Sequence, residues 1–254
     1  MNGLEGELKK LIIASVCLAV VFQANALDLK SLGDIADKAT KSTSSSSKGV
    51  ASLSDAETND GLKTALNQGV TKAVSMLGAT NGFFGNKEVK IPLPNSLKKI
   101  EQAMKLAGMG KQSDELVLKM NRAAEAAVPE AQALLVDSIK KMSLTDAKAI
   151  LTGPNDAATQ YFKRTTSAQM AEKFLPIVTK ATENVQLAAS YNKYAEMGAK
   201  LGVVKKEDAN IEKYVTGKAL DGLYLMIAKE ETAIRKDPLG QASSILKKVF
   251  GAVK

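Results

Sequence analysis

Apolar residues recur every three or four positions in this chain, from residue 54 almost to residue 254. That spacing is the period of one face of an α-helix, whereas a half-buried strand would alternate at every second position. The first run opens at Ser54, and Glu57 three positions later completes a capping-box pattern. The sequence therefore predicts a helix from residue 54 to about residue 77 with one buried stripe. The stripe consists of Leu62, Ala65, Leu66, Val70, Ala73, Val74 and Leu77.

Glycines and prolines that end helices divide the rest of the pattern into further elements. Ser113 is expected to cap one helix, and Pro176 to kink or break another. Lys87–Pro94 differs, because its apolar residues alternate as in an extended edge segment. We therefore predict an all-α bundle of about eight to ten helices, with at most one short extended segment or strand pair. The expected helices after the first are Asn95–Ala107, Ser113–Val128, Pro129–Met142, Asp146–Leu151, Asn155–Arg164, Thr166 to about Leu201, Glu207–Lys236 and Gln241–Val253.

Residues 1–26 have the three parts of a secretory signal peptide. Lys9 and Lys10 precede the apolar run Leu11–Phe22, and small residues follow at Ala24 and Ala26. A membrane anchor is the weaker interpretation, because a spanning helix needs roughly 17–25 residues. We expect cleavage after Ala26, a flexible Ser-rich lead at residues 27–52 and a single helical domain at residues 53–254.

The residue types that many catalytic and metal sites require are missing. The chain has no His and a single Cys, Cys17, which lies inside the predicted signal peptide. This composition excludes an imidazole general base, a Ser-His-Asp triad and a cysteine zinc cluster. The glycine-rich patterns that bind nucleotide phosphates do not occur in the sequence either. We therefore expect no metal and no cofactor, and we favour a protein that is not an enzyme.

The chain is basic, with 35 Lys and Arg against 27 Asp and Glu and a net charge of +8. Nucleic acid is not the expected partner, because the chain carries an export signal and only 4% aromatic residues for base stacking. Only three of its basic residues are Arg, the side chain that most often reads bases. The remaining expectations are a protein partner, an anionic envelope component, or simply solvated lysines on helix faces.

Several segments, taken together and in this order, carry a family resemblance. They are Gly82–Asn86, Val89–Pro94, Met120–Glu125, Asp146–Gly153, Ala158–Thr166 and Phe174–Val178. In this combination the chain resembles the bacterial family named domain of unknown function 4197, from about residue 53 to residue 254. The resemblance implies an exported, mainly helical protein of Gram-negative bacteria, and hence a periplasmic location. It supplies no activity, cofactor or catalytic residue.

Asn121, Arg122 and Glu125 form the first candidate binding cluster. They lie on the side of their helix opposite its main apolar stripe, together with Leu118, so this helix is expected to pack on two sides. Arg is scarce here, and its planar fork suits a carboxylate or a phosphate. The alternative is structural, with an internal Arg122–Glu125 pair or a bond from Arg122 to the end of a neighbouring helix.

The second candidate cluster consists of Tyr161, Lys163, Arg164 and Thr165. Its cations, its hydroxyls and the free N–H groups of a helix starting near Thr166 would together suit an anion. The alternative is again structural. The two cations then complement the end of one helix, and Thr166 with Gln169 caps the next.

Two further segments offer an apolar contact surface. Phe83 and Phe84 lie in a glycine-flanked turn, where they either fill the core or anchor a partner or bilayer. The expected helix Gln241–Val253 is amphipathic and basic, so it either docks on the core or makes a peripheral membrane contact.

Taken together, these features favour a periplasmic, non-enzymatic helical protein that binds a protein partner or an anionic envelope component. The alternative is a carrier of a lipid-like or apolar ligand in a pocket between helices, suggested by the Met and Ala content. A third hypothesis is an enzyme that uses carboxylates, Tyr or Lys, at Glu125 and Tyr161.

Overall fold

The computed structural model of the chain describes residues 54–95, 110–200 and 209–237, together with residues 97, 102, 105, 106, 108, 202, 204 and 205. Three predictions lie outside the described residues: the signal peptide, the Ser-rich lead and the helix Gln241–Val253. Most of the expected helix Asn95–Ala107 lies outside them as well. Within the described residues the secondary structure is helical and contains no strand, which confirms the all-α class.

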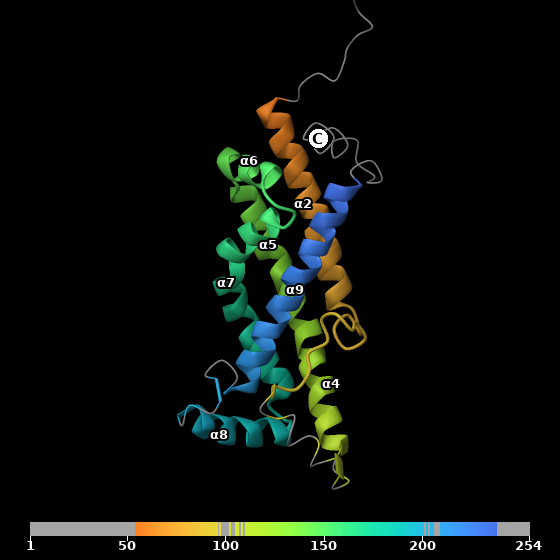
Figure 1. Ribbon diagram of the computed structural model, residues 1–254, viewed down its shortest axis with the longest axis vertical. Helices are drawn as coiled ribbons and strands as arrows, with labels where there is room; N and C mark the ends of the chain where they lie inside the picture. The colour runs from red at the N-terminus through yellow and green to blue at the C-terminus, as the bar shows by residue number, and fades with distance from the viewer. Residues whose placement is uncertain are drawn as a thin grey trace, which may run out of the picture. The chain divides into compact units, whose positions relative to one another are not determined.

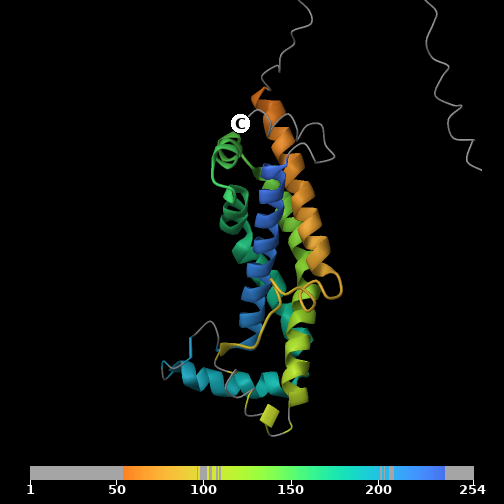
Figure 2. The ribbon, with the colours of Figure 1, turned by 45° about the vertical axis from the view of Figure 1, so that its right-hand side comes forward.

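The helices are long and lie lengthwise against one another. In chain order they are α2 (Asp55–Gly78), α4 (Gly110–Ala127), the short 3-10 helix η2 (Val128–Glu130), α5 (Ala131–Lys141), α6 (Leu144–Thr152), α7 (Ala157–Thr182), α8 (Gln186–Lys200) and α9 (Ile211–Lys236). The described residues contain fewer than eight α-helices, so the predicted count is not confirmed. Figures 1 and 2 show α9 between α2, α4 and α7, with α8 lying across the ends of α4 and α9.

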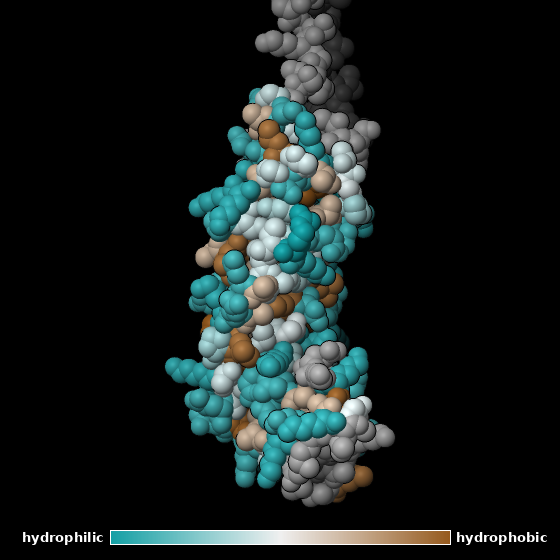
Figure 3. All heavy atoms as spheres, turned by 90° about the vertical axis from the view of Figure 1, so that its left-hand side faces the viewer, coloured by the Kyte–Doolittle hydropathy of each residue, from teal (hydrophilic) through white to brown (hydrophobic). Residues whose placement is uncertain are grey.

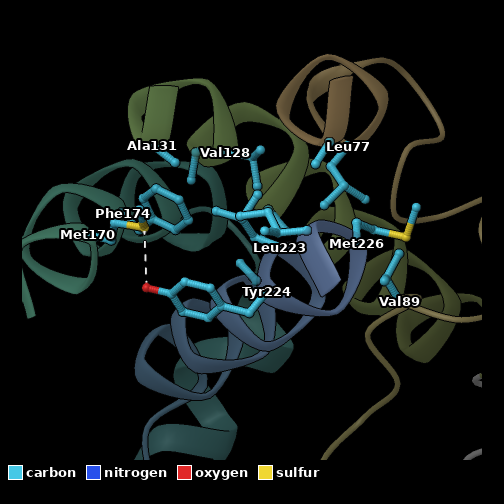
Figure 4. Close-up of a cluster of buried hydrophobic side chains, with 14 of the residues drawn as sticks. Leu77, Val89, Val128, Ala131, Met170, Phe174, Leu223, Tyr224 and Met226 are labelled. Carbon is cyan, nitrogen blue, oxygen red and sulfur yellow. Dashed lines mark hydrogen bonds between the residues drawn. The ribbon is translucent and has the colours of Figure 1, made fainter. Parts of the chain in front are cut away.

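The core is formed where α2, α4, α5, α7 and α9 meet. Figure 4 shows part of this core, where Leu77 of α2, Ala131 of α5, Phe174 of α7 and Leu223 of α9 lie close together. Phe83, Phe162 and Phe174 are fully buried. Because large side chains from every surrounding helix occupy this space, the centre of the bundle is filled by the protein itself.

The first helix agrees closely with the prediction. Ser54 accepts a hydrogen bond from the N–H of Glu57 at 3.2 Å, and the Glu57 carboxylate accepts the N–H of Ser54 at 3.0 Å. This capping box sets the start of α2. All residues of the predicted stripe are buried.

The predicted helix starts at Ser113 and Thr166 are wrong. Helix α4 begins at Gly110, so Ser113 is not its cap. Ser113 is buried in the first turn, and its hydroxyl donates to the Gly110 carbonyl at 2.9 Å. Helix α7 runs without a break from Ala157 to Thr182, where two helices were expected to meet near Thr166. The Thr166 hydroxyl donates to the carbonyl of Phe162 at 2.6 Å, a bond that a threonine inside a helix can make with the preceding turn.

Pro176 does not end α7, which continues past it to Thr182. A proline inside a helix removes one backbone hydrogen bond, and Pro176 lies on the exposed side, where water can replace that bond. The chain turns instead at residues 183–185, between α7 and α8.

The segment from residue 79 to residue 94 is a loop and contains no strand. Its predicted alternation is nevertheless present, since Val89, Ile91 and Leu93 are buried while Lys90 and Pro92 are exposed. We call this segment the 79–94 loop. It packs along α4 and α9, and these contacts position the sites described next.

Candidate functional site

Asn121 holds the last part of the 79–94 loop, at Ile91, against α4. Its side-chain oxygen accepts the N–H of Ile91 at 2.8 Å, and its amide nitrogen donates to the Ile91 carbonyl at 2.9 Å. The same nitrogen donates to the carbonyl of Val117 in its own helix. A buried side-chain amide thus supplies the donor and the acceptor that a neighbouring strand would otherwise provide.

Glu125 binds the beginning of the same loop. One carboxylate oxygen accepts the N–H groups of Phe83 and Phe84, each at 3.0 Å, and the other accepts Arg122 at 2.5 Å. Burial alone raises the pKa of Glu125, but the bonds from Phe84, Arg122 and Phe83 outweigh it and hold the pKa below its ordinary value. The carboxylate is therefore ionised at neutral pH, and its acceptor positions are occupied.

Arg122 connects three parts of this cluster. Besides Glu125 it bonds the Asn81 side chain at 2.8 Å, and its guanidinium lies 5.7 Å from the ring centre of Phe84. Asn81 has a positive φ of 68°, so Arg122 contacts the tightest point of the loop. We call Arg122 and Glu125, with the loop atoms they bind, the Glu125 clamp. The internal pair expected by the structural interpretation is present.

The two aromatic residues of the glycine-flanked turn have different environments. Phe83 is fully buried, and its ring packs against Gly222 of α9. A Cβ atom added at Gly222 would come within 2.7 Å of the Phe83 ring. Phe84 is half-buried, with the Lys90 ammonium 4.2 Å from its ring centre. Phe83 therefore belongs to the core, and Phe84 lies beneath cations at the surface.

The second cluster lies on α7 and faces α5, α6 and α9. The Tyr161 hydroxyl donates to the Ser138 carbonyl at 2.9 Å, and the hydroxyls of Thr165 and Ser138 are 2.7 Å apart. Arg164 is largely exposed; it lies 3.4 Å from Asp146 and 5.4 Å from the ring centre of Tyr161. Lys163 lies 5.7 Å from the ring centre of Tyr224. No hydrogen bond or ion pair among the described residues joins this cluster to Asn121, Arg122 and Glu125.

The helix start that was expected to complete this second site is missing, because α7 is continuous through residue 166. Its N–H groups there are used inside the helix and cannot face an anion. The predicted capping box of Thr166 and Gln169 is wrong for the same reason.

The sequence analysis missed a second buried clamp, formed by Glu231 and Arg235 of α9. Glu231 accepts the N–H groups of Ala158 and Thr159 at 2.9 and 3.0 Å, and so caps α7 from another helix. Arg235 donates to Glu231 at 2.9 Å and to the carbonyl of Ile150, at the end of α6, at 2.7 Å. We call this arrangement the Glu231 clamp. An Arg four positions after a Glu was the available signal, but its partners lie more than 70 positions away.

A groove rich in lysine is a further site that the sequence analysis missed. It has a volume of about 510 Å³ and lies between the end of the 79–94 loop and the first half of α9. The Tyr214 hydroxyl donates to the Pro92 carbonyl at 3.1 Å and ties its two walls together. We call it the lysine groove. It is lined by Pro92, Leu93, Asn95, Lys205, Lys213, Tyr214, Gly217, Lys218 and Asp221.

No group of three or more His, Cys, Asp or Glu side chains among the described residues is placed to hold a metal ion. None of the described helices combines the length and apolar character that crossing a membrane requires. Figure 3 shows one face of the molecule as mostly hydrophilic, with hydrophobic residues scattered over it.

The fold and these sites define an all-α protein in which arginine–glutamate clamps fasten loops and helix ends to a packed bundle. Residues 52–251 match the family model described as Protein of unknown function (DUF4197). The chain therefore belongs to this family, as its sequence segments indicated. No curated protein and no solved structure is found to match the chain.

Proposed function

We propose that this protein is exported to the periplasm, where it binds an anionic component of the envelope in the lysine groove without catalysing a reaction. The groove itself is the observation that carries this proposal. Three of its lining residues are Lys and one is Asp. A concave site of this size with a surplus of cations suits a small anion or an anionic group of a larger molecule.

The walls of the groove support a preformed site. One wall is the end of the 79–94 loop, which Asn121 fastens to α4 and Tyr214 fastens to α9. The other wall is α9, which packs against α2, α4 and α7. Because both walls are fixed before any ligand arrives, binding does not have to pay for ordering them.

The state of Glu125 speaks against the enzyme hypothesis. A general acid or base at neutral pH needs a pKa near 7, whereas the pKa of Glu125 is lowered and its oxygens are bonded. Tyr161 is buried and donates to a backbone carbonyl. Both residues are thus engaged in holding the fold.

The core gives no support to the carrier of an apolar ligand. Phe83, Phe162, Phe174 and Met170 are each fully buried where such a ligand would have to lie. A carrier needs an apolar space of several hundred Å³ between its helices. Native mass spectrometry of protein released gently from its own cells tests this alternative directly, since a discrete added mass of an apolar ligand would revive it.

The proposal is tested by reversing two charges in the groove. We expect the Lys213→Glu/Lys218→Glu variant of the mature chain to bind anionic envelope extract at least about tenfold more weakly, since each charge-assisted contact contributes about 1.5–3 kcal/mol. The matched control is Lys119→Glu/Lys173→Glu, which makes the same change of net charge at exposed positions on α4 and α7. Equal loss in both variants would show that net charge, not the groove, governs binding.

A further inference from the structure

Gly217 is the least expected residue in the lysine groove, because it lies inside α9, where glycine weakens a helix. Gly222, one turn further along, has a packing reason, since its Cβ would collide with Phe83. A Cβ at Gly217 would meet no atom of the described residues within 4 Å, and the φ of Gly217 is not in the left-handed region. Neither packing nor backbone conformation therefore requires glycine here. The missing side chain of Gly217 leaves open space on the α9 wall of the groove.

Two lysines on α9 flank this open space. Lys213 precedes Gly217 by one helical turn and makes no ion pair with another described residue. Lys218 follows directly and lies 3.1 Å from Asp221, in a pair in which both side chains are largely exposed. Such a pair adds little stability, so Lys218 can turn to a ligand at small cost.

Two N–H groups at the helix start next to the groove are already occupied. Asn192 accepts the N–H of Ile211 and Asn210 accepts the N–H of Lys213, each at 2.8 Å. These side chains occupy N–H groups in the first turn of α9 that would otherwise face a ligand. The cations that the described lining offers to an anion are therefore the lysine ammonium groups.

We infer that the ligand of the lysine groove carries a phosphate monoester, held between Lys213 and Lys218, with the attached organic group lying over Gly217. This inference rests on the proposed function. A phosphate monoester has about 1.5 to 2 negative charges at pH 7, enough to engage two ammonium groups, whereas a carboxylate or a sulfate ester has one. An arginine fork would suit a carboxylate or a phosphate equally, and no arginine lines this groove, so the choice between these anions rests on their charge. Pro92, Leu93 and Tyr214 form a less polar wall for the organic group.

The chemistry is tested by calorimetric titration of the mature chain with three probes that share one ring: phenyl phosphate, phenyl sulfate and benzoate. We expect phenyl phosphate to bind at least about tenfold more tightly than the other two at pH 7.5, with the preference shrinking at pH 5, because the second phosphate pKa is about 6. Equal binding of all three, lost in Lys213→Glu/Lys218→Glu, would overturn the phosphate assignment and leave the proposed function standing. No binding of any anion, soluble or on vesicles, would overturn both.

The position of the ligand is tested by Gly217→Leu, with Gly217→Ala as the smaller step. Leucine fills the open space and favours the helix, so we expect a raised Tm together with an affinity at least about tenfold lower. Because the variant gains stability, loss of binding cannot be attributed to unfolding. Unchanged affinity in Gly217→Leu would overturn the placement over Gly217.

A phosphate monoester in the groove has two sources, the headgroup of a lipid or a soluble ester. Vesicles containing phosphatidic acid present a phosphate monoester at a membrane surface. Vesicles containing phosphatidylglycerol present a phosphate diester, which is also negatively charged. Binding to the first vesicles and not to the second, lost in Gly217→Leu, identifies a lipid headgroup. Binding of phenyl phosphate without binding to either vesicle identifies a soluble ester. Equal binding to both vesicles would overturn the monoester assignment.

Discussion

Replacing Glu125 separates the two kinds of bond in its clamp. Glu125→Ala leaves the Phe83 N–H buried without an acceptor and leaves Arg122 without its carboxylate. A buried, unpaired N–H costs about 1–3 kcal/mol, and loss of one partner of a buried ion pair costs about 3–5 kcal/mol. The Arg122 side chain is 36% exposed, and this solvation reduces the contribution of the ion pair to the free energy of unfolding. We therefore expect Glu125→Ala to lower the free energy of unfolding by about 3 kcal/mol.

Two companion variants rank the contributions. Glu125→Gln keeps an oxygen for the N–H groups of Phe83 and Phe84 but turns an amide nitrogen toward Arg122, so about 1–2 kcal/mol should be lost. Arg122→Ala leaves both N–H bonds in place and should cost only about 1 kcal/mol, because the Arg122 guanidinium is itself partly solvated and the two N–H groups still bond the buried carboxylate. The expected order of destabilisation is thus Glu125→Ala, then Glu125→Gln, then Arg122→Ala.

Urea unfolding at pH 7 measures the three free energies, and hydrogen exchange locates the effect. The amides of Phe83 and Phe84 should lose protection in Glu125→Ala and keep most of it in Arg122→Ala. If Arg122→Ala proved as damaging as Glu125→Ala, the ion pair would dominate the clamp and the reasoning from backbone N–H groups would be refuted.

Three further predictions concern pH, α9 and the second clamp. The pKa of Glu125 in the folded protein lies below its ordinary value of 4.5. The ionised carboxylate therefore stabilises the fold fully above pH 4.5, and this stabilisation is lost as the pH falls through the folded-state pKa. The urea midpoints at pH 7 and pH 3 should differ more in the wild type than in Glu125→Gln. In thermal melts, Gly222→Ala should destabilise by about 1–3 kcal/mol, because its Cβ would come within 2.7 Å of Phe83, whereas Gly217→Ala should stabilise by up to about 1 kcal/mol. Glu231→Ala removes the cap of α7 and a buried partner of Arg235, and urea unfolding should show a loss of about 3–5 kcal/mol, while a loss under 1 kcal/mol would contradict the burial of this pair.

The buried faces of the helices could be predicted because the residue spacing that defines them lies within each helix. The stripe from Leu62 to Leu77 is a matter of spacing within one helix, and the box of Ser54 and Glu57 spans three positions. The continuity of α7 could not be predicted in the same way. Thr166 suits a helix start and a helix interior equally well until its hydroxyl finds a partner, and here it bonds the preceding turn and the Tyr224 hydroxyl.

The sites depended on contacts between distant parts of the chain. The carboxylate of Glu125 accepts the N–H groups of Phe83 and Phe84, which are 42 and 41 positions away. The residues next to Glu125 in the sequence give no indication of these partners. The lysine groove joins Pro92 with Tyr214, which are 122 positions apart. Gly217 was not among the predicted site residues, although a glycine inside a predicted helix is a position that calls for a packing or functional reason.

The three arginines explain why lysine is the residue to consider for ligand binding. A guanidinium presents several N–H donors at fixed directions, so one Arg can bond two segments at once. Arg122 uses this to join Glu125 to Asn81, and Arg235 to join Glu231 to the end of α6. The third, Arg164, lies across the ring of Tyr161. Two of the three arginines therefore join separate segments of the fold, and none lines the groove. The cations left to bind an anion there are lysines, whose single ammonium groups suit the compact, highly charged phosphate.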